Sequence, residues 1–337
     1  MATIKDVARV SGVSVTTVSI IMNGKAQERK ISDATCRRVQ EAMRELGYQP
    51  NLSARRLRYQ GSPKPVIVFF WPIDYRTSIL ASFLNALQLE IQKLNFDCEL
   101  VVQTYENDHL DQYGSLILKN GYSGMIIGAT SYLDLEYLEN LSPQMPLVLI
   151  NRISERFSTV GVDNREVGFM AAMQFQQKGY KEAAVFASEH SYVATGQRTQ
   201  AFLFACSQLG INVMADYIIK CPNTISGGCH AAKRYCGSQS PPKAIFCDSD
   251  TIAIGALNTF YRMGRRVPED TELLTIAMLD PDHAEYAIPP LSVLEMPNRE
   301  IGKQIIDLLY EKITMNSLEP KHVTLKANLI LRDSFRL

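Results

Sequence analysis

The sequence predicts an α/β protein with a small, basic, all-helical head and a larger body of two lobes with parallel sheets. Residues 1–65 hold 12 Lys and Arg against 5 Asp and Glu, although the whole chain has 35 of each. The head repeats apolar residues at helical spacing, whereas the chain from Val66 onward alternates short apolar runs with helical patterns, in two successive series. A length of 337 residues leaves room for two or three domains.

Composition excludes several classes of protein. Hydrophobic residues make up 46% and charged residues 21%, as in ordinary globular chains. No run approaches the roughly 18 apolar residues of a membrane span, and MATIKDVARV lacks the apolar core of a secretory signal. The seven cysteines form no C-x-x-C pair, which indicates reduced thiols rather than a disulfide or zinc framework. We therefore expect a cytoplasmic protein.

The head predicts a helix, a turn and a second helix. Thr3 can cap a first helix whose apolar stripe includes Val7 and Ala8, and Gly12 suits the tight turn that follows. Ser14 can cap a second helix that runs to Asn23. We expect its buried stripe at Val18, Ile21 and Met22, and its outward face at Thr16, Ser19, Ile20 and Asn23.

A third helix, capped by Ser32, should point Ala34, Val39, Met43 and Leu46 inward. Two short helices around a glycine turn form a helix-turn-helix, whose second helix fits a DNA major groove. Bundles of three small helices also bind proteins. The basic charge and the small polar outward face favour DNA.

The segments TIKDVARVSGVSVTTVSIIMNG and RRVQEAMRELGYQPNLSARRLR resemble the DNA-binding head of the LacI/GalR (lactose-repressor) family of bacterial transcription regulators. The resemblance implies that Val15, Thr16, Thr17 and Ile20 face the bases. Together with the helix pattern, it gives the DNA-contacting set expected in the head: Thr3, Ser14, Val15, Thr16, Thr17, Ser19, Ile20 and Asn23.

The resemblance also implies a hinge that becomes helical on the operator, with contacts from Asn51, Ala54, Arg55 and Leu57. The leucine would wedge into the minor groove, and flanking arginines could neutralise phosphates. Leu57 could instead pack the linker against the body.

One head residue departs from the family pattern. Members usually carry arginine at the position of Ile20, where a guanidinium could read guanine with two hydrogen bonds. Isoleucine offers only apolar contact, for instance to a thymine methyl group. We therefore expect an operator that differs from the commonest half-site of the family.

We expect a helix-turn-helix domain over residues 1–49, a hinge and linker over 50–65, and an effector-binding and dimerisation domain over 66–337. The resemblance implies a periplasmic-binding-protein-like body whose chain crosses between its lobes three times. On that basis lobe 1 comprises about 66–161 and 291–320, and lobe 2 comprises about 162–290 and 321–337.

Ligands of open α/β sheets bind beyond the carboxyl ends of the strands, so the cleft between the lobes is the expected effector site. Arg198 lies early in a predicted helix, and five polar residues follow predicted strands: Asp74, Asn151, Arg152, Asp248 and Asp250. The resemblance implies effector contacts most directly for Arg198 and Asp250. An interlobe salt bridge between these two residues, or a helix cap by Asp250, is the alternative.

The segment DYRTSIL (74–80) replaces an aromatic motif found in many family members, so the sequence does not name the effector. We expect a small, sugar-like molecule, no cofactor, no metal and no catalytic site, because no nucleophile is paired with a base and the histidines are isolated. The chain ends without a heptad segment, which favours a dimer on palindromic DNA. Two alternatives are a regulator controlled by a protein partner and a solute-binding protein, although the basic head disfavours the second.

Overall fold

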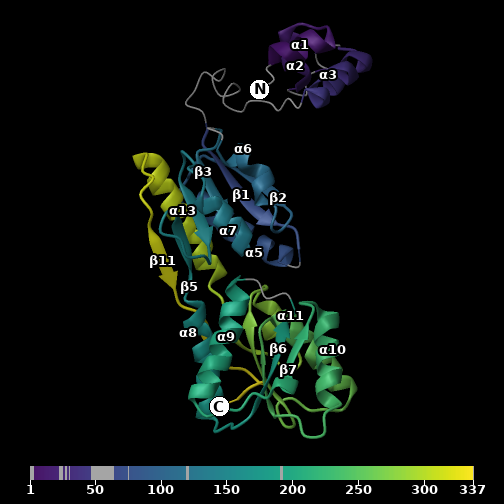
Figure 1. Cartoon of the computed structure of the whole chain (residues 1–337), viewed down its shortest axis with the longest axis vertical. Helices are drawn as coiled ribbons and strands as arrows, with labels where there is room; N and C mark the ends of the chain where they lie inside the picture. Colours follow the sequence, from purple (N-terminus) through teal and green to yellow (C-terminus); the bar gives the residue numbers. More distant parts are fainter. Residues whose placement is uncertain are drawn as a thin grey trace. The chain divides into compact units, whose positions relative to one another are not determined.

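The computed structural model describes residues 4–22, 26, 29, 31–46, 64–74, 76–118, 121–189 and 193–336. The chain divides into two compact units, Met1–Pro63 and Lys64–Leu337, within the Gly/Pro-containing segment 59–65. We describe each unit by itself and call them the head and the body (Figure 1). Several predicted contact residues lie outside the described residues: Thr3, Asn23, Asn51, Ala54, Arg55 and Leu57.

The described part of the head contains three helices: α1 (Ile4–Ser11), α2 (Val15–Met22) and α3 (Asp33–Glu45). Val7, Val18 and Val39 are fully buried at their centre. Gly12 lies between α1 and α2 with a φ of 68°, the left-handed conformation that glycine adopts at little cost. Ala34 was predicted to point inward but is exposed, because it lies in the first turn of α3; Ala42, two turns later, is the buried alanine.

Lobe 1 of the body is built on a six-stranded, all-parallel sheet in the order β11-β5-β4-β3-β1-β2. Its strands are β1 (Val66–Pro72), β2 (Glu99–Tyr105), β3 (Gly124–Ile127), β4 (Leu147–Ile150), β5 (Ser158–Val162) and β11 (His322–Leu325). Its helical elements are α5 (Thr77–Lys93), η1 (Leu110–Tyr113), α6 (Gly114–Ile117), α7 (Tyr132–Glu139) and α13 (Asn298–Met315).

Both faces of the middle of this sheet are covered, which explains why β1, β3 and β4 are apolar along their length and buried throughout. In β1 the side chains of Ile67, Phe69 and Trp71 pack with α5 and α13 on one face. Val68 and Phe70 pack on the other face with the segment that contains η1, α6 and α7.

Lobe 2 has a second six-stranded sheet, in the order β12-β10-β9-β8-β6-β7, in which only β12 is antiparallel. Its strands are β6 (Ala183–Ser188), β7 (Ile218–Cys221), β8 (Ala244–Cys247), β9 (Glu272–Ala277), β10 (Ser292–Glu295) and β12 (Asn328–Ile330). Its helical elements are α8 (Asn164–Gln177), α9 (Val193–Gln208), η2 (Ala215–Tyr217), α10 (Ile225–Cys236), α11 (Asp250–Arg262) and α12 (Asp282–Glu285). The pair α8 and α9 and the pair α10 and α11 pack on opposite faces.

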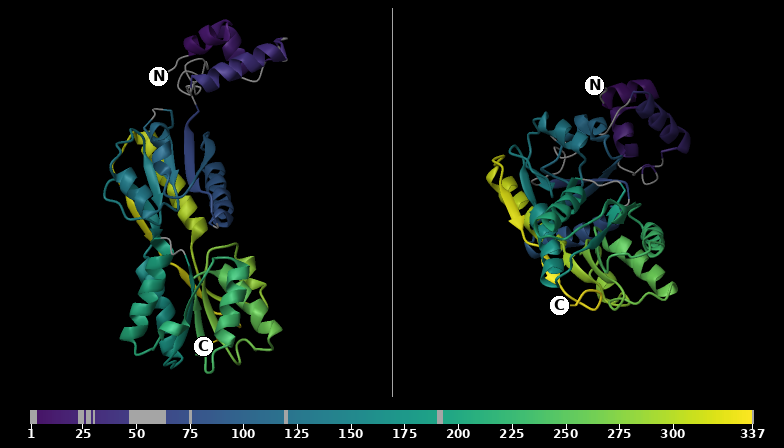
Figure 2. Two further views of the ribbon diagram at one scale, coloured as in Figure 1. Left: turned by 45° about the vertical axis from the view of Figure 1, so that its right-hand side comes forward. Right: turned by 60° about the horizontal axis from the view of Figure 1, so that its bottom comes forward.

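The chain passes between the lobes three times, after β5, after β10 and after β11, as the resemblance implies (Figures 1 and 2). The lobe boundaries differ from the expected ones at both ends of α13. Strand β10 belongs to lobe 2, because Ser292–Glu295 pairs with β9. Strand β11 belongs to lobe 1, because His322–Leu325 pairs with β5. These pairings join segments distant in sequence, and local periodicity carries no information about them.

Among the described residues, no helix combines the length and the apolar character needed to cross a membrane.

Candidate functional site

The N-terminus of α2 is held by the cap that the sequence predicts. The Ser14 Oγ accepts a hydrogen bond from the Thr17 backbone N–H at 3.0 Å, and it lies 2.9 Å from the Thr17 hydroxyl. These contacts satisfy one of the amides that the first turn of a helix leaves unpaired. They also engage Thr17 in the cap, so that its hydroxyl is already one partner in a local hydrogen bond.

On the outward face of α2, Thr16 is exposed, whereas Val15 and Ile20 are half-buried. Val15 contacts the apolar centre of the head through part of its side chain. Among the α2 contact residues whose side chains are described, Thr16 is therefore the one most available to a partner. Ser19 lies within α2.

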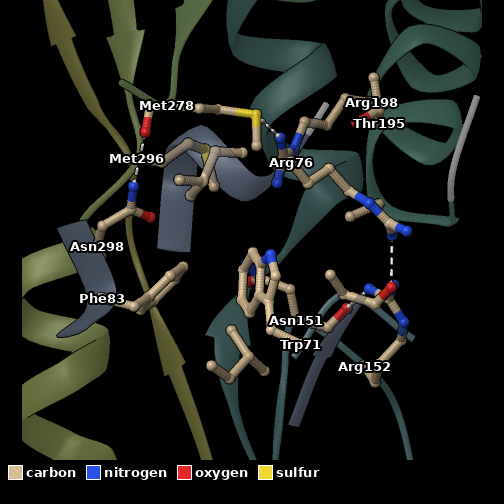
Figure 3. Close-up of a pocket in the computed structure, with 14 residues that line it drawn as sticks. Trp71, Arg76, Phe83, Asn151, Arg152, Thr195, Arg198, Met278, Met296 and Asn298 are labelled. Carbon is tan, nitrogen blue, oxygen red and sulfur yellow. Dashed lines mark hydrogen bonds between the residues drawn. The ribbon is translucent and has the colours of Figure 1, made fainter. Parts of the chain in front are cut away.

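The body has a cavity between its two lobes, close to the points where the chain crosses (Figure 3). Lobe 1 contributes Trp71, Arg76 and Asn151, and lobe 2 contributes Thr195 and Arg198. The space amounts to about 510 Å³, part of it open to solvent.

Trp71, at the end of β1, forms an apolar wall of the cavity together with Phe83 of α5, whose ring centroid lies 5.5 Å away. The indole fits because residue 128 is glycine: a Cβ there would lie 2.4 Å from Cζ3 of Trp71. The side chain is 3% exposed, and its Nε1–H has no hydrogen-bond partner. A buried donor without a partner costs free energy, and a ligand acceptor would remove that cost.

Arg76 reaches the cavity from the loop between β1 and α5. Its Nε donates to both carboxylate oxygens of Asp74, at 2.9 and 3.0 Å. Its terminal nitrogens donate to Asp74, to the Ala129 carbonyl, and to the side chain of Asn107 at 2.7 Å. Asp74 does not line the cavity; it holds the guanidinium that does.

Asn151 and Arg152 enter the cavity at the end of β4. Asn151 has a φ of 51°, and its Oδ1 accepts from the Val162 amide at 3.1 Å. Gly161 permits this close approach, because a Cβ there would lie 2.6 Å from that oxygen. The Arg152 guanidinium donates to backbone carbonyls of Thr130 and Asn151. Burial, then the charge of Arg76, lowers the pKa of Arg152 to about 10.

Arg198, from the second turn of α9, enters the cavity from lobe 2 and is 1% exposed. Its Nε donates to the Asn164 side chain at 2.8 Å, and Nη1 lies 3.5 Å from the Met278 sulfur (Figure 3). Helix α9 can pack this closely on α8 because Gly168 has no side chain: a Cβ there would lie 2.3 Å from the Arg198 carbonyl oxygen.

The two aspartates after β8 lie behind the cavity wall. Asp250 accepts from the Met278 and Leu279 amides at 3.0 Å, so it fixes the loop that brings Met278 to the cavity. Asp248 accepts from the Ser188 amide at 2.7 Å and from its hydroxyl at 2.9 Å. Burial raises the pKa of both carboxyls, that of Asp248 to about 6. The cap residue of α11 is Ser249, and Asp250 begins the helix.

The structure thus brings Asn151 and Arg198 together at the cavity and places Asp74 and Asp250 one layer behind it. Cavity residues that the sequence did not single out include Trp71, Arg76 and Asn298. Trp71 and Arg76 lie at or just after the end of β1, the strand end from which Asp74 was predicted to reach the effector. The strand end therefore indicated the right part of lobe 1, but the acidic residue was chosen instead of the tryptophan and the arginine beside it.

No group of three His, Cys, Asp or Glu side chains able to hold a metal occurs within the described ranges.

Comparisons with known proteins agree with this arrangement. The description "Bacterial regulatory proteins, lacI family" fits residues 3–51, and "Periplasmic binding protein-like domain" fits residues 172–335. A crystal structure of a LacI family transcription regulator from Clostridium acetobutylicum shares 33% identity and covers 80% of this chain and 100% of its own, with a TM-score of 0.76. The chain belongs to the lacI family of bacterial regulatory proteins.

Similar curated proteins match the lacI-family chain over its full length. The probable HTH-type transcriptional repressor ExuR of Bacillus subtilis is 29% identical over 100% of this chain and 99% of its own. The HTH-type transcriptional repressor CytR of Escherichia coli K12 is 27% identical over 99% and 96%. A lac repressor dimer bound to operator and an anti-inducer, at 20% identity, shares the fold over 99% of both chains, with a TM-score of 0.71.

Family membership identifies the chain as a DNA-binding transcription regulator with a helix-turn-helix head and a two-lobed body. Members of this family are regulators rather than enzymes, which confirms the prediction made from the absence of a catalytic arrangement in the sequence.

Proposed function

We propose that the chain is a cytoplasmic, dimeric repressor of transcription that binds a palindromic operator and responds to a small molecule in the interlobe cavity. The observation that carries the proposal is the pairing of a lacI-type head with a body whose cavity draws buried polar side chains from both lobes. A twofold operator requires two heads, and therefore a dimer. The similar repressors ExuR and CytR support repression as the direction of control.

The head would read DNA with α2. Thr16 contacts a base edge or a phosphate, and Ile20 contributes apolar contact to a thymine methyl group. Ser14 and Thr17 hold the N-terminus of the helix at the right orientation through the cap that joins them. The other DNA contacts expected from the sequence belong to the same proposal, including insertion of Leu57 into the minor groove.

In the body, Asn151 and Arg198 contact the effector directly, and Asp74 and Asp250 act by positioning Arg76 and Met278. An effector that touches both lobes favours one interlobe arrangement over others. If that arrangement sets the separation of the two heads of a dimer, effector and operator affinities are coupled, and the coupling is reciprocal.

The test uses the full chain. Selection from random duplexes should enrich a sequence with twofold symmetry, and sedimentation should give one dimer on each duplex. Recovery of no enriched sequence would refute operator binding. If operator binding is unaffected by every metabolite but altered by a protein from the same cell, control by a protein partner replaces control by the cavity.

A further inference from the structure

The interlobe cavity presents guanidinium groups to a ligand but no carboxylate. Arg76, Arg152 and Arg198 all line it, and each is at least nine-tenths buried. None of the described residues that line the cavity is an aspartate or a glutamate. This asymmetry is unexpected for a site that binds only neutral hydroxyl groups, because such groups need acceptors as well as donors.

The carboxylates nearest the cavity are engaged elsewhere. Asp74 offsets the charge of Arg76 by a direct ion pair. Asp248 and Asp250 accept hydrogen bonds from Ser188 and from the amides of the Met278 loop. Asp134, which is buried in α7, accepts from the Leu110 amide at 3.0 Å. The carboxylate oxygens therefore accept hydrogen bonds from the protein itself, and the charged groups that line the cavity are the guanidinium donors.

Arg152 carries the clearest excess of positive charge. Across the part of the chain that the structure describes, no carboxylate oxygen lies within 4.0 Å of its guanidinium. Its hydrogen bonds go to neutral carbonyl oxygens. Its Nη1 and Nη2 each have a second N–H beyond those bonds, and paired N–H groups in one plane match the two oxygens of an oxyanion.

The other walls of the cavity indicate what kind of molecule would carry the oxyanion group. The Trp71 Nε1–H is a further buried donor that lacks an acceptor, and the rings of Trp71 and Phe83 offer an apolar face. Near Phe83, the Asn298 amide nitrogen donates to the Met278 carbonyl at 3.0 Å, which leaves its oxygen facing the cavity (Figure 3). That oxygen can accept a hydrogen bond from one ligand hydroxyl.

We propose that the effector is a small hydroxylated anion, a sugar acid or a sugar phosphate, whose oxyanion group is held by Arg76, Arg152 and Arg198 and whose ring lies against Trp71. This inference rests on the proposed function, since it names the chemical class of the molecule that the cavity senses. It narrows the small, sugar-like molecule expected from the sequence to an anion, because Asp74 and Asp250 make their hydrogen bonds to the protein and do not line the cavity.

The direct test is calorimetric titration of the full chain at constant ionic strength with matched pairs. D-glucuronate, D-galacturonate and glucose 6-phosphate are compared with D-glucose and D-galactose. At least one anion should bind about 100-fold more tightly than its neutral parent, because a neutral ligand leaves the buried Arg152 guanidinium without an anionic partner. Binding of the acids alone identifies a carboxylate, and binding of the phosphate alone identifies a phosphate ester.

Equal or tighter binding of the neutral sugars overturns the proposal, and so does saturable binding by none of the anions. Both outcomes leave operator selection, which is measured separately on the same chain, as an independent result. A loss of sequence-specific DNA binding would instead count against the proposed function.

Substitutions can distinguish the loss of a charged contact with the anion from a general loss of folding. The double variant Asp74→Asn/Arg76→Gln removes one guanidinium and its counter-charge together, so that no buried carboxylate is left unpaired. It should weaken anion binding at least tenfold. Arg156→Gln removes an exposed arginine of lobe 1 that does not line the cavity, and should leave anion affinity within twofold. Trp71→Phe keeps the apolar face but removes the donor, and should weaken binding severalfold. Unchanged affinity in the double variant would remove Arg76 from the site.

Discussion

Asp74 and Arg76 form a side-by-side ion pair in which the guanidinium Nε lies 2.9 and 3.0 Å from the two carboxylate oxygens. The Arg76 side chain is 6% exposed and the Asp74 side chain is 16% exposed. Two residues that are two positions apart after β1 therefore fix one guanidinium at the cavity. Asp74 can influence a ligand only by holding Arg76 in place.

Asp74→Asn should weaken effector binding, because an amide oxygen cannot accept from two guanidinium nitrogens as a carboxylate does. We expect a five- to tenfold loss of affinity and a decrease of about 1–3 kcal/mol in the free energy of unfolding. Calorimetry and chemical denaturation measure the two quantities. Asp97→Asn, at an exposed residue of the same lobe, is the matched control. An unchanged affinity in Asp74→Asn would show that the pair does not position Arg76.

Gly128→Ala should displace the Trp71 indole, because the added Cβ would lie 2.4 and 2.6 Å from two of its ring carbons. Overpacking of this kind costs about 1–3 kcal/mol. Trp71 is the one tryptophan of the chain, so tryptophan emission, excited at a wavelength that tyrosine does not absorb, reports on this wall of the cavity. We expect a shifted emission maximum and weaker effector binding.

Gly237→Ala is the control for that experiment, since a Cβ at residue 237 would have no atom closer than 3.5 Å. An emission spectrum of Gly128→Ala identical to that of the native chain would mean that the indole does not rely on the glycine.

Asp248 should make stability depend on pH in an unusual direction. Burial raises the pKa of its carboxyl from 3.8 to about 6, so between these values the folded chain binds the proton that the unfolded chain has lost. The contribution of Asp248 to the free energy of unfolding is therefore highest below about pH 4. It falls as pH rises toward 6, and the total decrease is up to about 3 kcal/mol. Asp248→Asn removes this titration. The difference in unfolding free energy between the native chain and the variant should follow that curve, and a flat difference from pH 4 to 7 would contradict it.

Ile20→Arg should change which operators are selected. Isoleucine offers a base only apolar contact, whereas arginine donates two hydrogen bonds to guanine, a pairing worth about 1–3 kcal/mol of discrimination. Selection from random duplexes should therefore add a guanine at one position of each half-site. Ile20→Leu, which remains apolar, should keep the native preference. If both variants select the native sequence, Ile20 does not face the bases.

Much of the fold was predictable because its strands are short apolar runs buried on both faces. The short runs Leu147–Ile150, Ala244–Cys247 and Ser292–Glu295 form β4, β8 and β10, as their composition predicts. The sequence also predicts a last strand near residues 326–331, where β12 lies, but it does not predict β11. The residues of β11 alternate between exposed and half-buried, so no apolar run marks that strand.

The cavity was less predictable than the fold. Strand ends located the region correctly, and Asn151 and Arg198 do line it. Residue type did not show that Asp250 turns to the amides of residues 278 and 279, because that loop is distant in sequence. Arg152, which follows the same strand as Asn151, lines the cavity as its position suggested.

The most direct test of the central claim is an operator-binding titration of the full chain, using the duplex recovered by selection, with and without a saturating sugar acid. We predict sequence-specific binding of one dimer to each twofold-symmetric duplex, and a change in operator affinity of at least tenfold when the acid that binds the cavity is added. Binding that does not distinguish the selected duplex from random competitor DNA, or an operator affinity that no cavity ligand alters, would contradict it.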